Sequence, residues 1–302
     1  MPDLLGKPVV LLNPTANRGK MQPYRHLLQQ RAEQEGADYY ETRQQGEARE
    51  KAREAALSGR PVIIAGGDGS VNEVVNGLLQ AGKSVPLGIV AAGSGNDFAW
   101  NALQLPKDPQ QAIERAFTGQ LQDVDAGIVN GAYFVNSFSV GLDADIAAAA
   151  DELKKVPFLS GKRLYYASIL RQLLFGYHRC PWLTFSLDGA PPIYTQERHY
   201  VFIAATNGPS YGAGFRVNPQ ADISDGWLDI CTVDYLPLLR ALTLLSVIQK
   251  GHHAGLPEVH MYRAKKLQIE SNVPVYFGLD GETRQATKLE IELLPAALQI
   301  RR

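Results

Sequence analysis

The chain has 302 residues, of which 45% are hydrophobic and 20% are charged, so it can bury one large core or two ordinary ones. Its 30 Lys and Arg residues against 31 Asp and Glu residues give a net charge of -1. This balance lacks the excess positive charge of a general nucleic-acid binder, so we expect no nucleic acid among the partners.

The cysteines and the hydrophobic pattern indicate the compartment. Cys180 and Cys231 are far apart and lie in no metal-ligand spacing, which predicts neither a disulfide framework nor a zinc site. No basic segment followed by an apolar run opens the chain, and no later stretch reaches the length of a membrane span. We therefore expect a cytoplasmic protein.

The first 120 residues alternate short apolar runs with amphipathic segments, which is typical of a parallel sheet covered by helices. The expected strands are Val9–Leu12, Asp38–Thr42, Pro61–Ala65 and Leu87–Ala91. The expected helices are Tyr24–Glu35, Glu47–Leu57, Val71–Gln80 and Gln110–Thr118. The pattern predicts an α/β N-terminal domain over residues 1–125.

The rest of the chain has β-branched and aromatic residues at short spacing, which predicts a mostly antiparallel C-terminal domain over residues 126–302. The extreme C-terminus could pack back on the first domain. The expected strands are Ala132–Val140, Trp182–Leu187, His199–Ala205, Trp227–Val233, Lys265–Ile269 and Val275–Phe277. Two helical insertions are expected at Arg163–Tyr177 and Leu238–Lys250.

Four unusual segments follow the four N-terminal strands, namely Asn13–Lys20, Thr42, Gly66–Ser70 and Ala92–Asp97. In a parallel sheet these segments emerge at the carboxyl ends of the strands, where open α/β folds bind ligands. The glycines of the third segment allow close backbone approach to a phosphate. Asp68 among them predicts a magnesium ion between itself and the phosphate, unless it only forms an ordinary turn.

The fourth segment repeats the third with different side chains. Ser94 is available to a phosphate oxygen, and Asn96 or Asp97 to a metal ion or its waters. Asn96 or Asp97 could instead cap a helix that begins at Phe98, and both interpretations can hold together.

Two carboxylate motifs lie in the second domain. Asp280 and Glu282 are one glycine apart after an apolar run, so one could accept a proton while the other holds a metal ion; a plain hairpin tip is the alternative. Asp225 and Gly226 form a turn that could hold a cation.

Five ordered motifs, NPTANRGK, GGDGS with VNEVVNGL, GSGNDFAWNAL, NGPSYGAGFRVNPQADISDGWLDI and LDGET, resemble those of the soluble bacterial diacylglycerol kinase and lipid kinase family. The similarity covers nearly the whole chain. It implies a nucleotide domain like that of NAD kinases and phosphofructokinases, a C-terminal β-sandwich, and ATP bound in the cleft between them.

The loops and the resemblance together give a set of candidate site residues. The candidate nucleotide-binding residues are Asn13, Thr42, Gly66, Gly67, Asp68, Gly69, Ser70, Val71, Asn72, Gly93, Ser94 and Asn96. The resemblance implies a magnesium network at Asp68, Asp97 and Glu282, and a separate structural cation held by Asp225 with the carbonyls of Asp222 and Trp227.

The implied activity is ATP- and Mg²⁺-dependent phosphorylation of a lipid hydroxyl, most simply diacylglycerol to phosphatidic acid. The general base falls on Asp280 or Glu282. We favour Asp280, because it comes directly off a strand, although sequence order does not fix the assignment. The alternatives are a metabolite kinase of the NAD kinase type and a catalytically silent nucleotide or lipid sensor.

A lipid substrate implies reversible contact with the inner membrane surface. The segment Lys154–Arg179 offers basic residues beside an apolar stripe, although the stripe could pack as an ordinary core helix. The residues concerned are Lys154, Lys155, Lys162, Arg163, Arg171, Leu173, Leu174 and Phe175. The sequence leaves the oligomeric state open, with a homodimer as one possibility.

Overall fold

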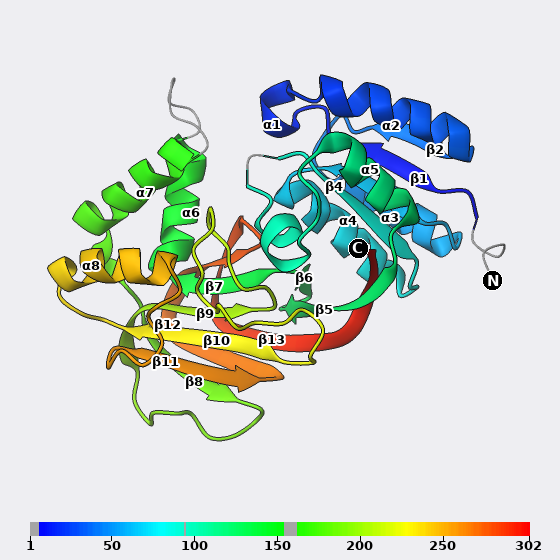
Figure 1. Cartoon of the computed structure of the whole chain (residues 1–302). Helices are drawn as coiled ribbons and strands as arrows, with labels where there is room; N and C mark the ends of the chain where they lie inside the picture. Colours follow the sequence, from blue (N-terminus) through cyan, green and yellow to red (C-terminus); the bar gives the residue numbers. More distant parts are fainter. Residues whose placement is uncertain (1–5, 94, 154–161) are drawn as a thin grey trace. The chain divides into compact units, whose positions relative to one another are not determined.

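The computed structural model describes residues 6–93, 95–153 and 162–302 (Figure 1). Contacts group the chain into two compact units. Unit 1 comprises Met1–Ala126 and Pro295–Arg302, and unit 2 comprises Gly127–Leu294. In the described residues, no helix has the length and apolar character needed to cross a membrane.

Unit 1 alternates strands and helices. Its strands are β1 (Val9–Leu12), β2 (Asp38–Glu41), β3 (Val62–Gly66) and β4 (Pro86–Ala91), with the start of β5 (Leu121–Val129). Its helices are α1 (Ala16–Gly19), α2 (Gln22–Glu35), α3 (Glu47–Leu57), α4 (Asp68–Ala81) and α5 (Pro109–Thr118), with a π-helical turn at Phe98–Ala102.

The sheet of unit 1 is parallel, as predicted, with the order β4-β3-β1-β2. Strands β1, β3 and β4 are buried along their whole length, because helices cover both faces. On one face, Leu28 of α2 and Ile113 of α5 pack against Val10 and Ile63 of the sheet. The continuous apolar runs of the sequence reflect this burial on both sides.

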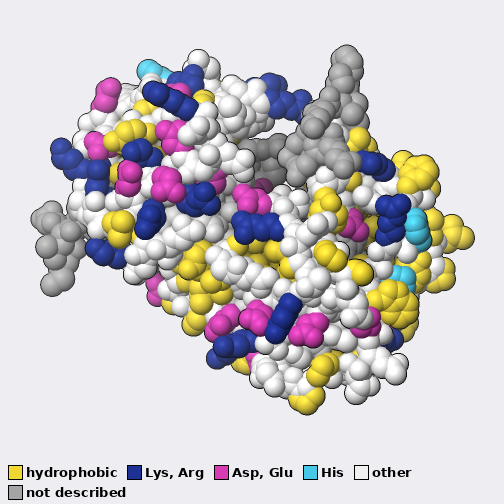
Figure 2. Space-filling model, turned by 180° about the vertical axis from the view of Figure 1, so that it is seen from behind, with side chains coloured by type: hydrophobic (Ala, Val, Ile, Leu, Met, Phe, Trp, Pro, Cys, Tyr) yellow, Lys and Arg dark blue, Asp and Glu magenta, His cyan; other side chains and the backbone are white. Residues whose placement is uncertain are grey.

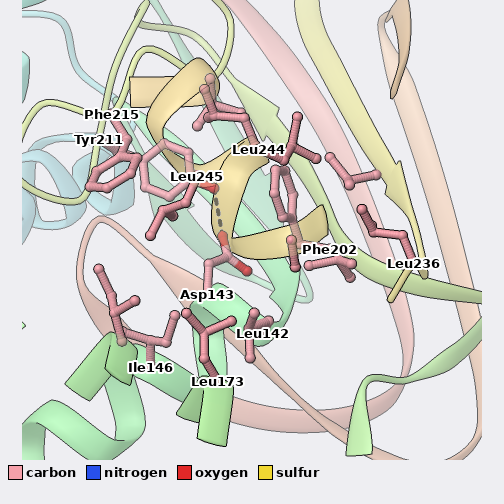
Figure 3. A pocket seen from close by; sticks show the side chains of 16 residues that line it. Leu142, Asp143, Ile146, Leu173, Phe202, Tyr211, Phe215, Leu236, Leu244 and Leu245 are labelled. Carbon is pink, nitrogen blue, oxygen red and sulfur yellow. Dashed lines mark hydrogen bonds between the residues drawn. The ribbon is translucent and has the colours of Figure 1, made fainter. Parts of the chain in front are cut away.

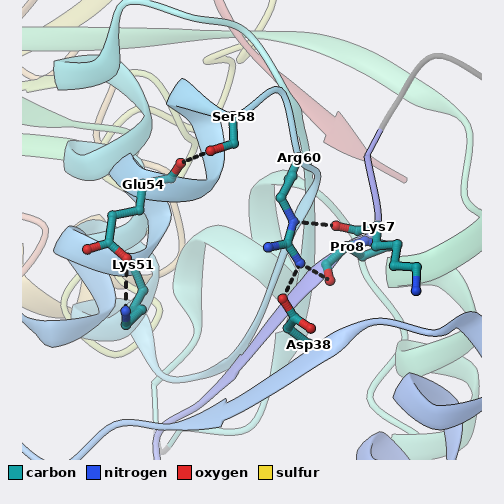
Figure 4. A network of polar contacts seen from close by, with 7 residues as sticks. All are labelled: Lys7, Pro8, Asp38, Lys51, Glu54, Ser58 and Arg60. Carbon is teal, nitrogen blue, oxygen red and sulfur yellow. Dashed lines mark hydrogen bonds and ion pairs between the residues drawn. The ribbon is translucent and has the colours of Figure 1, made fainter.

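Arg60 ties the amino ends of three strands together (Figure 4). Its guanidinium donates to the backbone carbonyl of Lys7 at 2.7 Å and to that of Pro8 at 3.4 Å. It also donates to the Asp38 carboxylate in β2 at 2.6 Å. Since Arg60 directly precedes β3, one side chain links the entries of β1, β2 and β3.

The C-terminal end of β13 (Glu282–Arg301) completes this sheet. Gln299 and Ile300 pair in parallel with Pro86 and Leu87 of β4. Ile300 is fully buried. The last residues of the chain are therefore part of the core of unit 1.

Unit 2 holds the remaining elements. Its strands, besides the ends of β5 and most of β13, are β6 (Ala132–Phe134), β7 (Ser137–Gly141), β8 (Trp182–Leu187), β9 (Arg198–Thr206), β10 (Leu228–Asp234), β11 (Val259–Ala264) and β12 (Lys266–Leu279). Its helices are α6 (Leu142–Leu153), α7 (Lys162–Phe175) and α8 (Leu238–Gln249), with a 3₁₀ turn at Tyr177–Arg179.

The strands of unit 2 pair antiparallel, as predicted, and their order is β11-β10-β9-β7-β12-β13. Side chains of β9 alternate between two hydrophobic clusters. Ile203 and Ala205 join the cluster between strands, whereas Phe202 and Ala204 join the cluster under α6, α7 and α8. Both faces of β9 are therefore buried.

Two predictions about these elements were wrong in detail, and helix α6 was missed. The expected strand Ala132–Val140 is two strands, because the chain breaks its pairing at Val135 and Asn136. The expected strands Lys265–Ile269 and Val275–Phe277 are one strand, β12, with an irregular register between Glu270 and Val275. Helix α6 was not predicted, since its run of alanines shows no apolar stripe.

We predict that Ile300→Ala destabilises unit 1. Loss of a fully buried Ile side chain costs about 2–5 kcal/mol of unfolding free energy, because the cavity refills only in part. Hydrogen exchange should accelerate at the β4 amides that β13 contacts. Val273→Ala, at a residue that is 61% exposed, is the control. Unchanged exchange in β4 would show that the C-terminal strand does not support unit 1.

Candidate functional site

The segments that follow β1, β2 and β3 meet at the carboxyl edge of the unit 1 sheet. Asn13 follows β1, and its side-chain amide donates to the Ser70 hydroxyl at 2.8 Å. Thr42 follows β2, and its backbone N–H donates to the Leu12 carbonyl at 2.9 Å. The structure thus brings Asn13 and Ser70 together across two strands, as parallel strands require.

The GGDGS motif is the start of a helix. Helix α4 begins at Asp68 with Gly67 as its N-cap, whereas the helix expected from the sequence began at Val71. The backbone N–H groups of a first turn have no carbonyl partner within the helix, so they can bind an anion. A side chain at Gly66 would lie 2.6 Å from the Ser70 hydroxyl, so only glycine fits there.

The two glycine loops touch each other through backbone atoms. A Cβ atom on Gly93 would lie 2.4 Å from the Cα of Gly67, which no real contact tolerates. From the other side, a Cβ atom on Gly67 would lie 3.2 Å from the Cα of Gly93. The loops that contain Gly67 and Gly93 therefore form one continuous backbone surface.

Hydrogen bonds of Asn96 and Asp68 stabilise the contact between Gly67 and Gly93. The Asp68 carboxylate accepts the backbone N–H of Asn96 at 2.7 Å. The Asn96 side chain accepts the Gly93 N–H at 3.0 Å and donates to the Gly93 carbonyl at 2.7 Å. Asn96 is buried in the left-handed region at φ 61°, a conformation that its short side chain stabilises by local hydrogen bonds.

The remaining candidate residues at this edge of the sheet differ in burial and in hydrogen-bond partners. Val71 and Asn72 lie on the buried face of α4, where Asn72 accepts two hydrogen bonds from Asn76. The carboxylate of Asp97 accepts the Asn101 side-chain amide at 2.9 Å, beside the π-helical turn. Ser94 lies outside the described residues.

Asp280 lies at the turn between β12 and β13. Asp280 and Gly281 both have positive φ, 45° and 92°, which is typical of a tight hairpin. The Asp280 carboxylate accepts three backbone N–H groups, from Val135 at 2.8 Å, Asn136 at 3.0 Å and Ser137 at 2.9 Å. The hairpin turn therefore also holds the break between β6 and β7.

Glu282 begins β13, directly after this turn. Its carboxylate lies 3.4 Å from the Arg284 guanidinium, and its side chain is 36% exposed. The two acids of the motif thus have different surroundings: Asp280 binds backbone amides, and Glu282 pairs with a side chain near solvent.

The expected structural cation site holds an ion pair between side chains. Asp225 contacts the Arg263 guanidinium and accepts the Trp227 N–H at 3.1 Å, while Asp222 accepts from Ser224. Among the described residues, no group of three or more His, Cys, Asp or Glu side chains could hold a metal ion. The structural cation stays a prediction.

Two family models match the chain. The diacylglycerol kinase catalytic domain matches residues 7–129, and the YegS C-terminal NAD kinase beta sandwich-like domain matches residues 136–302. A diacylglycerol kinase from Bacillus anthracis strain Sterne has the same fold, with a TM-score of 0.74, 21% identity, and coverage of 98% of this chain and 96% of that one.

Three curated relatives agree with these matches. The diacylglycerol kinase of Mycobacterium tuberculosis H37Rv is 32% identical over 99% of this chain and 96% of its own. The diacylglycerol kinase of Bacillus subtilis 168 is 28% identical, over 90% and 88%. The "probable lipid kinase YegS-like" protein of Pectobacterium atrosepticum is 32% identical, over 85% and 83%.

The two-unit fold, the glycine-rich site and these matches define the class of protein as a lipid kinase. The chain belongs to the diacylglycerol kinase family. The resemblance inferred from the five motifs is confirmed.

We predict that Gly93→Ala destabilises the protein without any ligand present. The added methyl must separate Gly93 from Gly67, and backbone strain of this kind costs about 1–3 kcal/mol. The control is Gly69→Ala in the first turn of α4, where a Cβ atom meets nothing within 4 Å. Thermal unfolding should give a lower Tm for Gly93→Ala alone; equal values would contradict the close contact.

Proposed function

We propose that this lipid kinase transfers the γ-phosphoryl group of ATP to the hydroxyl of diacylglycerol, giving phosphatidic acid. The observation that carries the proposal is the backbone contact between Gly67 and Gly93 at the carboxyl edge of a parallel sheet. It supports a phosphate site made of backbone, in a chain whose relatives are named diacylglycerol kinases.

The phosphates of ATP would bind at the first turn of α4. The N–H groups of Gly69 and Ser70 belong to that turn, and the positive end of the helix dipole favours an anion there. Asn13 positions the Ser70 hydroxyl beside them. The GGDG segment makes this mode of binding comparable with that of NAD kinases and phosphofructokinases.

The acids of the site suit a hard divalent cation, which binds oxygen ligands. Asp68 and Asp97 of unit 1 would hold Mg²⁺ directly or through water. When bound, Mg²⁺ neutralises negative charge on the transferred phosphoryl group. One oxygen of Asp68 accepts the Asn96 N–H at 2.7 Å. An ion bound by Asp68 would therefore also be linked to the loop that contains Asn96.

The contacts of Asp280 and Glu282 bear on the choice of general base. Both oxygens of Asp280 accept backbone N–H groups, so a proton taken by Asp280 would displace one of these bonds. Glu282 lies in a more open position. These contacts favour Glu282, the second of the two sequence-based alternatives, as proton acceptor, with Asp280 positioning the segment 135–137.

The direct test of the activity uses γ-labelled ATP and Mg²⁺ with a panel of lipids in mixed micelles, and NAD as the soluble alternative. We expect label in a phosphatidic acid product that requires both diacylglycerol and Mg²⁺. Label in NAD would favour the metabolite kinase. ATP binding with no turnover on any acceptor would favour a sensor.

We predict different losses for Glu282→Gln and Asp280→Asn. Loss of a positioned general base lowers kcat by about 10²–10⁴-fold. If Glu282 is that base, Glu282→Gln should show this loss with a normal melting temperature. Asp280→Asn should lower both kcat and Tm, because an amide cannot accept all three N–H groups. Full kcat in Glu282→Gln, with loss only in Asp280→Asn, would restore Asp280 as the base.

We also propose reversible membrane contact through α7 and α8. On α7, Leu170, Leu174 and Phe175 are 55%, 58% and 71% exposed, and on α8 Leu239 is 79% exposed. The two helices are neighbours, since Gln249 donates to the Tyr166 hydroxyl at 3.0 Å. Hydrophobic and basic side chains mix along this side of unit 2 (Figure 2).

The alternative, that α7 is an ordinary core helix, fits only the face of α7 that packs against the sheet. Leu173 is buried against the strands, whereas the exposed face keeps apolar residues together with Arg163 and Arg171. Such a mixed surface suits the interface of an anionic bilayer. Lys154 and Lys155 lie outside the described residues, as does the side chain of Lys162.

We predict that Leu174→Gln with Phe175→Gln reduces sedimentation with anionic vesicles about tenfold or more, since two exposed apolar side chains no longer enter the interface. Val273→Gln changes an equally exposed apolar residue of unit 2 and serves as control. Equal binding of all three proteins would refute the proposed surface.

A further inference from the structure

Three strand ends meet beside the LDGET motif of unit 2. Strand β7 begins at Ser137, which pairs with Thr206 at the end of β9. The next residue of β7 pairs with the last residue of β12. Since β7 runs antiparallel to both neighbours, the segments 135–136, 207–210 and 280–282 all lie at the same edge of the sheet.

The backbone of Asn136 connects the other two segments. Its N–H donates to the Asp280 carboxylate at 3.0 Å. Its carbonyl accepts the N–H groups of Asn207 at 2.9 Å and Gly208 at 3.2 Å. One residue therefore joins the turn of the LDGET motif to the loop that follows β9.

The side chains of Asn136 and Asn207 add two hydrogen bonds to this link. The Asn136 amide donates to the Ser210 carbonyl at 3.0 Å, and the Asn207 amide donates to the Val135 carbonyl at 3.0 Å. Asn136 is 6% exposed and Asn207 is fully buried. A buried donor that loses its partner is costly, so these bonds hold the two segments in a single geometry.

The loop after β9 is also held at its far end. Tyr211, directly after Ser210, donates its hydroxyl to the Asp143 carboxylate at 2.5 Å (Figure 3). Asp143 lies in the first turn of α6, just beyond the end of β7, whereas Asn136 lies just before its start. The segment 207–211 is therefore bonded to the chain on both sides of β7.

We propose that Asn136 is a positioning residue for phosphoryl transfer. It acts through Asp280 and keeps the turn that carries Glu282 in a fixed place relative to the segment 207–211. The inference rests on the proposed function, which takes the proton acceptor from this turn. A misplacement of ~1 Å in a supporting contact can lower the rate of a positioned reaction by about 10²-fold.

Asn136→Asp tests this role with almost no change in shape. Among the residues that the structure describes, Oδ1 of Asn136 has no hydrogen-bond partner, so its side chain contributes only the donation to Ser210. An ionised carboxyl cannot make this donation, whereas a protonated carboxyl can.

We expect kcat of Asn136→Asp to fall by about 10- to 100-fold at a pH of about 8, because the support of Asp280 shifts. The KM for ATP should not change. The ratio of the variant's kcat to that of the wild type should recover as the pH falls towards ~6, since buried carboxyls have raised pKa values and titrate in this range.

Asn218→Asp is the matched control. Asn218 is 1% exposed, and its amide donates to the Thr206 hydroxyl and to the Asp229 carbonyl, at 2.9 Å each. Its Oδ1 also lacks a partner within the described part of the chain. Both variants should lower Tm at neutral pH, but only Asn136→Asp should lower kcat of the folded enzyme. Equal kcat losses in the two variants, or wild-type kcat in a folded Asn136→Asp, would overturn the positioning role.

Hydrogen exchange of the wild-type protein gives a second measurement that does not depend on the fold of a variant. In low urea, the amides of Asn136 and Ser137 should open with the same free energy and the same urea dependence as those of Asn207 and Gly208, because the two segments open as one unit. Separate opening of the two segments would overturn the link. Failure of the wild-type enzyme to phosphorylate any lipid would instead overturn the proposed function.

Discussion

The backbone contact between Gly67 and Gly93 is the constraint on which the arrangement of unit 1 depends. It holds the ends of two neighbouring parallel strands closer than side chains would allow. Asp68 then binds the Asn96 N–H, and Asn96 binds Gly93, so the loop after β4 is fixed to the first turn of α4. A phosphate-binding surface made of backbone atoms needs such fixing, because glycine-rich segments are otherwise free to move.

Unit 2 uses a carboxylate in the same way. Asp280 accepts three backbone N–H groups and so holds the chain where β6 ends and β7 begins. In both units an acid that the sequence names as a candidate site residue also stabilises a turn. The proposed roles of Asp68 and Asp280 and their structural contacts therefore depend on the same carboxylates, and conservative amide variants with a stability measurement separate the two better than alanine variants do.

Much of the fold could be predicted from the sequence. The buried runs at Val9–Leu12 and Pro61–Ala65 predicted parallel strands, and this placed the segments that contain Asn13 and Ser70 at one edge of the sheet. Helix α6 could not be predicted, because an alanine-rich segment carries no apolar stripe. Its helix depends on packing against the rest of unit 2. The strand break at Val135 depends on Asp280, far along the chain, and local patterns do not report such a contact.

The same limit explains why sequence reasoning missed the apolar cavity beneath α6, α7 and α8 of unit 2. Its lining comes from these three helices, from strands β9 and β10 and from loop residues, and its polar pair joins Asp143 to Tyr211. The only local signals were an acid within the apolar segment Leu142–Leu153 and a tyrosine between glycines at Tyr211. Either residue alone is ordinary; the hydrogen bond between them in a buried setting is what identifies the pair.

The central claim, that the two glycine loops form one phosphate site, is tested most directly by hydrogen exchange with and without ATP and Mg²⁺. The account predicts slower exchange of the Gly69 and Ser70 amides together with those of the loop at Gly93 and Asn96, and little change in β10 or β11. Protection confined to one loop, or protection only in unit 2, would contradict it.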